Sequence, residues 1–248
     1  MGDHWEWVTL GTGFLCGAGR LVTCAHVIED PHGSDIARQH VDTDHYALVS
    51  HDDEGNWQYY IGAFQKEVTM FVDVSHDLAF LYLGENFYHA PDGAVVRDKR
   101  EYIRVGRSPS LIGNQVGVLG YPLVKLEFES NDIQKPKLGD VILRADLGVV
   151  NARYAAAVDK VYYDYTMAFN PGNSGGPVFD TETGRAIALV QGFKTINILT
   201  REVDVPTTLT PVKYGLESYI SNVTASYSVG IALFPLEAIL SRHGVSFE

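Results

Sequence analysis

Cysteine is scarce in this sequence of 248 residues, which contains only Cys16 and Cys24. The two flank a predicted hairpin turn at residues 17–20, in a register that puts Cys16 opposite Leu21 and Cys24 opposite Gly13. Because the two sulfur atoms are then not cross-strand neighbours, a disulfide between them would be strained. We expect two free thiols in the core, which fits a reducing compartment, and without a CxxC spacing they indicate no metal site.

Long apolar runs and an excess of basic charge are also missing. No stretch of about 18 apolar residues occurs, so the sequence predicts no transmembrane helix. The formal net charge of -12 repels polyanions, so we expect neither nucleic acid nor a membrane surface as a partner. The start, MGDHWEWVTL, lacks the basic and apolar segments of a secretory signal. We therefore expect a cytoplasmic protein; the alternative is a secreted or periplasmic protein that has lost its signal peptide.

Helical periodicity is nearly absent, and short apolar runs separated by Gly, Asn, Asp and Pro predict an all-β fold. The one expected helix covers about residues 235–243, because Pro235 suits a first helical position and Gly244 suits a left-handed cap. A mixed, charged stretch at 88–110 is the expected connection between two halves, residues 1–105 and 106–248. Residues 29–45 and 194–227 form long polar insertions. The expected strands are 10–15, 21–24, 46–50, 58–63, 68–74, 78–83, 115–119, 141–154, 161–169, 176–179, 186–192 and 228–233.

The strongest motif is PGNSGGP at residues 171–177. A serine that attacks an amide must stand at an exposed turn, where backbone N–H groups converge on the oxyanion that forms. Gly172, two residues before Ser174, gives the backbone the freedom that such a turn requires. We expect an oxyanion hole at Gly172, Asn173 and Ser174, with the N–H groups of Gly172 and Ser174 as donors. A glycine-rich turn between strands is the structural alternative.

Two further residues supply the partners that a nucleophilic serine needs. His26 follows an apolar strand, and Asp77 stands at the head of another. Considered alone, a histidine or an aspartate at such a position more often has a structural role than a catalytic one. Together they give the order His, Asp, Ser, in which the acid holds the tautomer of the histidine and the histidine takes the serine proton. The spacing also puts His26 and Asp77 in one half of the chain and Ser174 in the other, as a site in a cleft between two β-barrels requires.

These motifs resemble the trypsin-like serine proteases of the chymotrypsin fold, and within them the HtrA-like branch, here without a PDZ domain. The matching segments are 11–14 (GTGF), 23–27 (TCAHV), 77–81 (DLAFL), 117–122 (GVLGYP), 172–176 (GNSGG), 184–188 (GRAIA) and 230–235 (GIALFP). The resemblance implies two six-stranded antiparallel β-barrels with a short C-terminal helix, the catalytic triad His26, Asp77 and Ser174, and no cofactor or metal. Asn173 replaces the Asp of digestive members, so we do not expect zymogen activation of their type.

The resemblance also implies a serine endopeptidase that works through an acyl-enzyme. The family places Ala168 at the floor of the specificity pocket, which with Phe169 and Gly192 predicts a small to medium apolar P1 residue. Gln191 and Gly192 are expected on the strand that pairs with an extended polypeptide substrate. Two alternatives remain open: a protease effector that a regulatory protein partner must order, for example in a bacterial defence pathway, and a non-catalytic peptide-binding member of the fold.

Overall fold

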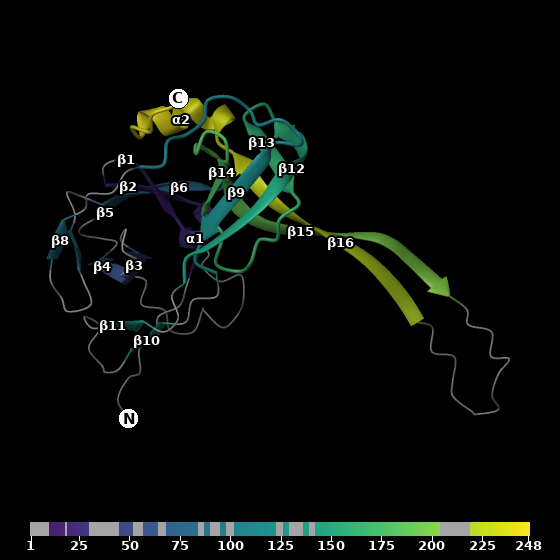
Figure 1. The fold of residues 1–248 in the computed structure, drawn as a ribbon, viewed down its shortest axis with the longest axis horizontal. Coiled ribbons are helices and arrows are strands. Elements are labelled where there is room, and N and C mark those ends of the chain that lie inside the picture. Colours follow the sequence, from purple (N-terminus) through teal and green to yellow (C-terminus); the bar gives the residue numbers. More distant parts are fainter. Residues whose placement is uncertain are drawn as a thin grey trace.

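A computed structural model describes most of the chain and shows a mainly β fold, as the sequence predicted (Figure 1). No helix in the described part is long and apolar enough to cross a membrane. The described residues are 10–17, 19–29, 45–51, 57–63, 68–83, 87–89, 95–97, 102–122, 126–128, 136–138, 142–203 and 219–248.

The C-terminal half forms a closed antiparallel barrel in the strand order β12-β13-β16-β15-β14-β9. Side chains alternate along β13, so that Val161, Tyr163 and Tyr165 point inward and are buried with Val116 and Val178. This barrel confirms one half of the predicted architecture. Its strands are β9 (Gln115–Gly120), β12 (Arg144–Ala157), β13 (Lys160–Tyr165), β14 (Pro177–Asp180), β15 (Ala186–Val203) and β16 (Tyr219–Ala232).

The N-terminal half differs from the prediction of a second closed six-stranded barrel. Its described strands form two four-stranded sheets, β1-β2-β6-β5 and β3-β4-β7-β8, and no described pairing joins them. They meet through side chains instead, since Leu48 packs against the cluster of Leu21, Leu81 and Leu83. The strands are β1 (Phe14–Gly17), β2 (Arg20–Thr23), β3 (His45–His51), β4 (Trp57–Ala63), β5 (Val68–Asp73), β6 (Leu78–Leu83), β7 (Phe87–His89) and β8 (Val95–Arg97).

Several elements escaped the sequence analysis because they are too short for a periodic pattern. Strands β7, β8, β10 (Leu126–Phe128) and β11 (Pro136–Leu138) have three residues each. The expected insertion at 194–227 is largely regular structure, because β15 and β16 pair as far as Val203 and Tyr219 and leave the barrel as a long ribbon (Figure 1). Residues 30–44, most of the other expected insertion, lie outside the described part of the chain.

The predicted C-terminal helix is present as a 3-10 turn η1 (Phe234–Leu236) followed by α2 (Glu237–Arg242). Pro235 lies in the first turn, and Gly244 follows the helix at φ +74° as predicted. Leu236 and Leu240 are buried in a core cluster that also contains residues of β1, β6, β15 and β16. The helix therefore covers a core to which both halves of the chain contribute.

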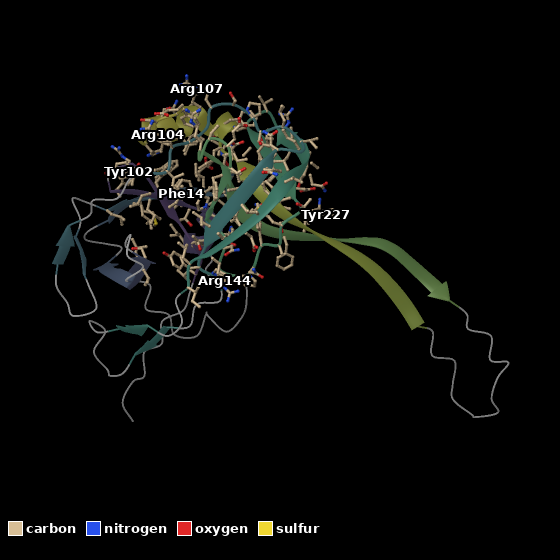
Figure 2. The ribbon with its side chains drawn as sticks, in the orientation of Figure 1. Phe14, Tyr102, Arg104, Arg107, Arg144 and Tyr227 are labelled. Carbon is tan, nitrogen blue, oxygen red and sulfur yellow. The ribbon has the colours of Figure 1, made fainter. Side chains whose placement is uncertain are left out.

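The segment between the halves runs past this helix. Val105 forms isolated bridges with Ala186 and Phe247. Arg107, which Figure 2 labels, forms a surface ion pair in which its Nη2 lies 3.0 Å from Glu237 Oε1. Such exposed pairs contribute little to stability, so the bridges of Val105 are the firmer connection. The division of the chain at residues 105 and 106 stays a prediction.

Both cysteines are free and buried, which confirms the predicted thiols. The register differs from the expected one, because Leu15 rather than Cys16 lies opposite Leu21 and the pairing is irregular at Cys16. Burial raises the pKa of Cys16 to about 12, so its thiol stays protonated at neutral pH.

A close approach between the halves at Gly175 predicts a stability difference between two glycines. A Cβ on Gly175, at φ +82°, would lie 2.0 Å from Thr23 Oγ1 and 2.2 Å from the carbonyl oxygen of Thr12, whereas one on Gly184, at φ +70°, would meet nothing within 4 Å. Gly184→Ala should cost about 1–2 kcal/mol for the left-handed backbone alone. Gly175→Ala should cost a further 1–3 kcal/mol, roughly, because neighbouring atoms must move. Urea unfolding measures both, and equal losses would contradict the close approach.

Candidate active site

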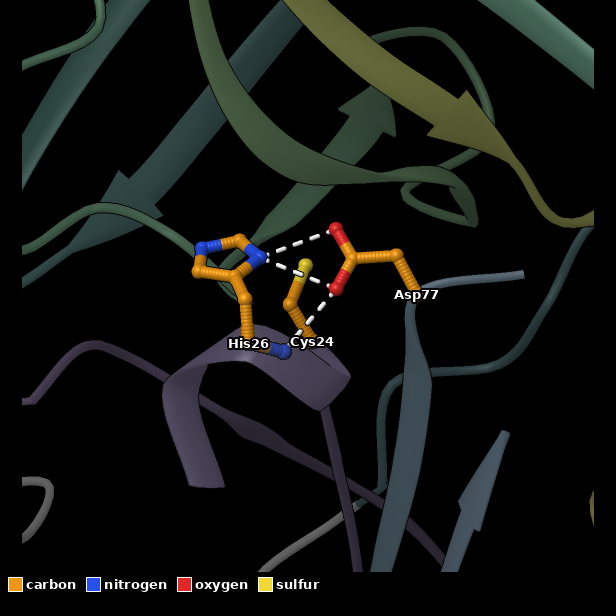
Figure 3. A group of neighbouring side chains, drawn as sticks. All are labelled: Cys24, His26 and Asp77. Atoms are coloured by element: carbon orange, nitrogen blue, oxygen red, sulfur yellow. Dashed lines mark hydrogen bonds and ion pairs between the residues drawn. The ribbon is translucent and has the colours of Figure 1, made fainter. Parts of the chain in front are cut away.

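His26 and Asp77 form the best-defined contact of the site. The ring Nδ1 of His26 lies 2.9 Å from both carboxylate oxygens of Asp77, and the backbone N–H of His26 donates to Asp77 Oδ1 at 3.0 Å (Figure 3). The short helix α1 (Ala25–Glu29), which the sequence analysis missed, carries His26 and turns its ring toward Asp77. The histidine side chain is 41% exposed and that of the aspartate 13%, so the ring remains accessible while the acid is covered.

Asp77 occupies an unusual backbone conformation in the turn before β6. Its φ is +52°, the one positive value that a non-glycine residue has in the described part of the chain. Aspartate tolerates this left-handed region better than most residues because its short side chain can bond locally. Burial by itself would raise the pKa of Asp77, but hydrogen bonds from His26 and Gln191 outweigh burial and lower it. An ionised Asp77 holds the His26 proton on Nδ1 and leaves Nε2 as an acceptor.

Cys24 lies beside this pair, and the donor atoms of Cys24, His26 and Asp77 are within 4.8 Å of one another (Figure 3). Metal binding would require a thiolate and a free ring nitrogen. Burial and the charge of Asp77 raise the pKa of Cys24 well above its usual value, and its Sγ donates to the carbonyl of Val190 at 3.2 Å. Since the Cys24 thiol stays protonated, this donor set does not favour a metal ion.

Ser174 approaches the pair from the other half of the chain, and Gln191 lies between them. The Ser174 hydroxyl donates to the carbonyl of Gln191 at 3.3 Å, and Gln191 Nε2 donates to Asp77 Oδ2 at 3.2 Å. Among the described hydrogen bonds none joins Ser174 Oγ to His26. The structure thus links Ser174 to Asp77 through Gln191, with the serine hydroxyl turned to a backbone acceptor.

The side chain of Gln191 is a contact that sequence reasoning missed. Its strand β15 pairs with β16 in a register that shifts between Val190 and Gly192, which marks an irregularity at Gln191. Such bulges redirect a side chain relative to the regular alternation. The sequence holds no signal for this contact, because Gln191 and Asp77 are 114 positions apart.

The loop before Ser174 has the backbone donors that an oxyanion needs. The N–H of Asn173 donates to the carbonyl of Asn170 at 3.0 Å, whereas those of Gly172 and Ser174 donate to no described acceptor. Gly172 adopts φ +95°, a conformation that suits glycine. Of the predicted oxyanion residues, Gly172 and Ser174 therefore offer free donors, and Asn173 holds the turn. The side-chain Oδ1 of Asn173 is buried and unpaired among the described groups.

Thr12 connects the loop that contains Gly172 and Ser174 to the N-terminal half by hydrogen bonds. The sequence analysis assigned no role to Thr12. Its Oγ1 donates to the carbonyl of Gly172 at 2.6 Å and accepts the N–H of Tyr121 at 3.1 Å. Its backbone N–H donates to the carbonyl of Ser174 at 2.7 Å. Thr12 is 6% exposed, so these bonds are sheltered from water. The GTGF segment at 11–14, which contains Thr12, was the available sequence signal. The motif did not reveal which atoms Thr12 contacts.

The residues predicted to bind substrate lie in different surroundings. Ala168 is exposed, whereas Phe169 is 7% exposed and packs with Tyr165 in the barrel core. The backbone N–H of Phe169 donates to Ser228 Oγ at 2.9 Å. Gln191 and Gly192 stand on β15, as expected. The contribution of these four residues to specificity stays a prediction.

The sequence of this site identifies its family. The profile of the family described as trypsin-like peptidase domain matches residues 11–189, which is most of the chain and includes His26, Asp77 and Ser174. The chain therefore belongs to the trypsin-like peptidase domain family. No curated protein sequence matches it significantly.

Solved structures are similar to this chain at low sequence identity. The HtrA-type protease AlgW with a decapeptide matches 96% of this chain at 16% identity, with a TM-score of 0.50. This chain spans 53% of the length of that protein. The Rv3671c protease of M. tuberculosis in its active form matches 95% of this chain at 19% identity and 74% of its own length, with a TM-score of 0.48.

The lowered pKa of Asp77 predicts a pH-dependent stability difference. Stability from a carboxylate with a lowered pKa is present above the ordinary value of about 3.9 and is lost as pH falls through the folded value. Asp77→Asn should therefore cost about 2 kcal/mol at neutral pH, because charged hydrogen bonds are lost, and progressively less in acid. Urea unfolding of both proteins across the acid range measures this, with the exposed Asp146→Asn as control. A cost that does not vary with pH would contradict an ionised, hydrogen-bonded Asp77.

The bonds of Thr12 predict a contrast between two substitutions. Thr12→Val keeps the shape but leaves the carbonyl of Gly172 without this donor, so the free energy of unfolding should fall by about 1–3 kcal/mol. Thr12→Ser keeps the hydroxyl and should cost less. Urea unfolding separates the cases, and a larger loss in Thr12→Ser than in Thr12→Val would assign the role of Thr12 to its methyl group.

Proposed function

We propose that this chain is a serine endopeptidase, with Ser174 as nucleophile, His26 as general base and Asp77 as the acid that orients His26. The observation that carries the proposal is the paired contact of His26 Nδ1 with the Asp77 carboxylate, which Gln191 links to Ser174. The loop of Ser174 has two N–H groups that donate to no described acceptor. Family membership supports the same reaction class.

The proposed reaction is acyl transfer. Ser174 Oγ forms a bond to the carbonyl carbon of the scissile peptide while its proton passes to His26 Nε2. The N–H groups of Gly172 and Ser174 stabilise the oxyanion. His26 then gives the proton to the amine as the C–N bond breaks, and water releases the acid from Ser174 by the same steps. No cofactor enters this scheme.

A polypeptide in extended conformation is the proposed substrate. One relative of similar fold was solved with a decapeptide, which supports a peptide as ligand here too. The exposed position of Ala168, which carries no acid, supports an apolar rather than a basic P1 residue. Gln191 and Gly192 on β15 supply the edge along which such a peptide would pair.

A protease that a partner must activate is the second candidate, and one observation favours it. The Ser174 hydroxyl bonds to the carbonyl of Gln191 rather than to His26. A regulatory protein that turns this hydroxyl toward His26 would complete the triad. A non-catalytic peptide-binding module would have no use for the ionised Asp77 or the free N–H donors beside Ser174.

Active-site labelling tests the proposal without knowledge of the natural substrate. A fluorophosphonate should react once with the wild-type chain, as phosphorus bonds to Ser174 Oγ and fluoride leaves, and intact mass should reveal the adduct. Ser174→Ala should not react, and with a peptide substrate its kcat should fall by about 10⁶. Ser241→Ala, which changes an exposed serine on α2, should react like the wild type.

The other outcomes separate the candidates. A folded wild-type chain that stays unlabelled would rule out constitutive activity and leave the partner-gated protease or the binding module. Labelling of Ser174→Ala would show that another residue is the nucleophile.

A further inference from the structure

The position of Asp77 depends on the turn that precedes it, residues 74–77 between β5 and β6. Asp77 is held at a positive φ within this turn, and its own N–H donates to the carbonyl of Val74 at 3.2 Å. A left-handed backbone at a non-glycine residue persists only when neighbouring contacts fix it. The contacts of this turn therefore control where the carboxylate points.

His76, the residue next to Asp77, makes a contact with each half of the chain. Its Nδ1 lies 2.6 Å from Asp73 Oδ2, at the end of β5, and its Nε2 lies 3.2 Å from Asp159 Oδ2, in the turn between β12 and β13. The side chain of His76 is 14% exposed. Only a doubly protonated imidazolium can donate to both carboxylates at once.

A second contact joins the same two turns. Lys160 Nζ donates to the carbonyl of Ser75 at 2.7 Å, and the Ser75 hydroxyl donates to Asp73 Oδ1 at 2.6 Å. The charged groups that contact His76 in the described part of the chain are thus Asp73 and Asp159, and Lys160 joins them through Ser75. These three leave one net negative charge, which a protonated His76 neutralises and a neutral His76 does not.

We propose that His76 is a positioning residue for the reaction, whose imidazolium clamps the turn of Asp77 between Asp73 of one half and Asp159 of the other, so that the His26–Asp77 contact depends on pH. The effect of this clamp on the reaction rests on the proposed function. The clamp itself depends only on the contacts between the turn at 74–77 and the turn between β12 and β13.

The direction of the pH dependence follows from the charges. Burial by itself would lower the pKa of His76, but the hydrogen bonds to Asp73 and Asp159 outweigh burial and raise it. The clamp is therefore complete below the ordinary histidine value of about 6.5 and is lost as pH rises through the higher folded value. The pKa of Asp73 is lowered, so that carboxylate stays charged throughout. Alkali therefore removes the clamp as His76 loses its proton.

Two variants with the same change of charge, Asp159→Asn and Asp146→Asn, test the clamp. The readout is the pH dependence of the labelling rate, which a general loss of stability would not shift. The fluorophosphonate labelling rate of the wild type, measured from about pH 5.5 to about pH 9, should fall at the alkaline end as His76 loses its proton. Asp159→Asn removes one carboxylate from His76 and should move the alkaline fall down by roughly 0.5 pH unit. Asp146→Asn makes the same change of charge at another exposed position of the barrel and should keep the wild-type profile. His76→Gln should label roughly fivefold more slowly near pH 6.5 and lose the alkaline fall.

The downfield proton NMR signal of the Nδ1–H that His26 donates to Asp77 gives a second readout, independent of the chemistry of Ser174. The signal should weaken at alkaline pH. The pH at which it weakens should be lower in Asp159→Asn than in Asp146→Asn. An unlabelled wild type with this NMR behaviour would count against the proposed function and support the clamp. A wild type without an alkaline fall or NMR change would overturn the clamp, as would identical profiles for Asp159→Asn and Asp146→Asn in folded proteins.

Discussion

The backbone contact between residues 11–13 and the loop at 172–176 is the constraint on which the site depends. The N–H of Thr12 donates to the carbonyl of Ser174 at 2.7 Å, and a Cβ on Gly11 would lie 2.7 Å from that same carbonyl oxygen. Such an approach leaves no room for side chains, so glycines stand on both sides, at Gly11 and Gly175. Because His26 and Asp77 come from one half and Ser174 from the other, their distances are set by this contact.

A partly buried charge is the second feature that both halves share. Asp77 accepts hydrogen bonds from His26 in the N-terminal half and from Gln191 in the C-terminal barrel. A sheltered carboxylate that lost these donors would bear the full cost of desolvation, so the bonds fix its ionisation as well as its direction. The neighbouring His76 and Asp159 form an analogous cross-connection at the surface, with weaker coupling because Asp159 is 59% exposed.

The barrel strand β15 serves two purposes along its length. Near its start it lines the site, where the irregular pairing around Gln191 directs an amide to Asp77 and a carbonyl to Ser174. Further on it leaves the barrel with β16 as a ribbon (Figure 1). The sequence analysis interpreted the second part as a polar insertion, but β15 and β16 are paired there as far as Val203 and Tyr219.

The sequence by itself determined the family, the order His26, Asp77, Ser174, most strands and the C-terminal helix with its Pro235 and Gly244. These features depend on local patterns: apolar runs, turn residues and a glycine-rich motif. Only the tertiary structure decided that the N-terminal strands form two sheets instead of a closed barrel, since strand pairing between distant segments leaves no local mark. It also decided the contacts of Gln191 with Asp77, Thr12 with Gly172, and His76 with Asp159. Each joins residues far apart in the chain, and only folding brings them within hydrogen-bond distance.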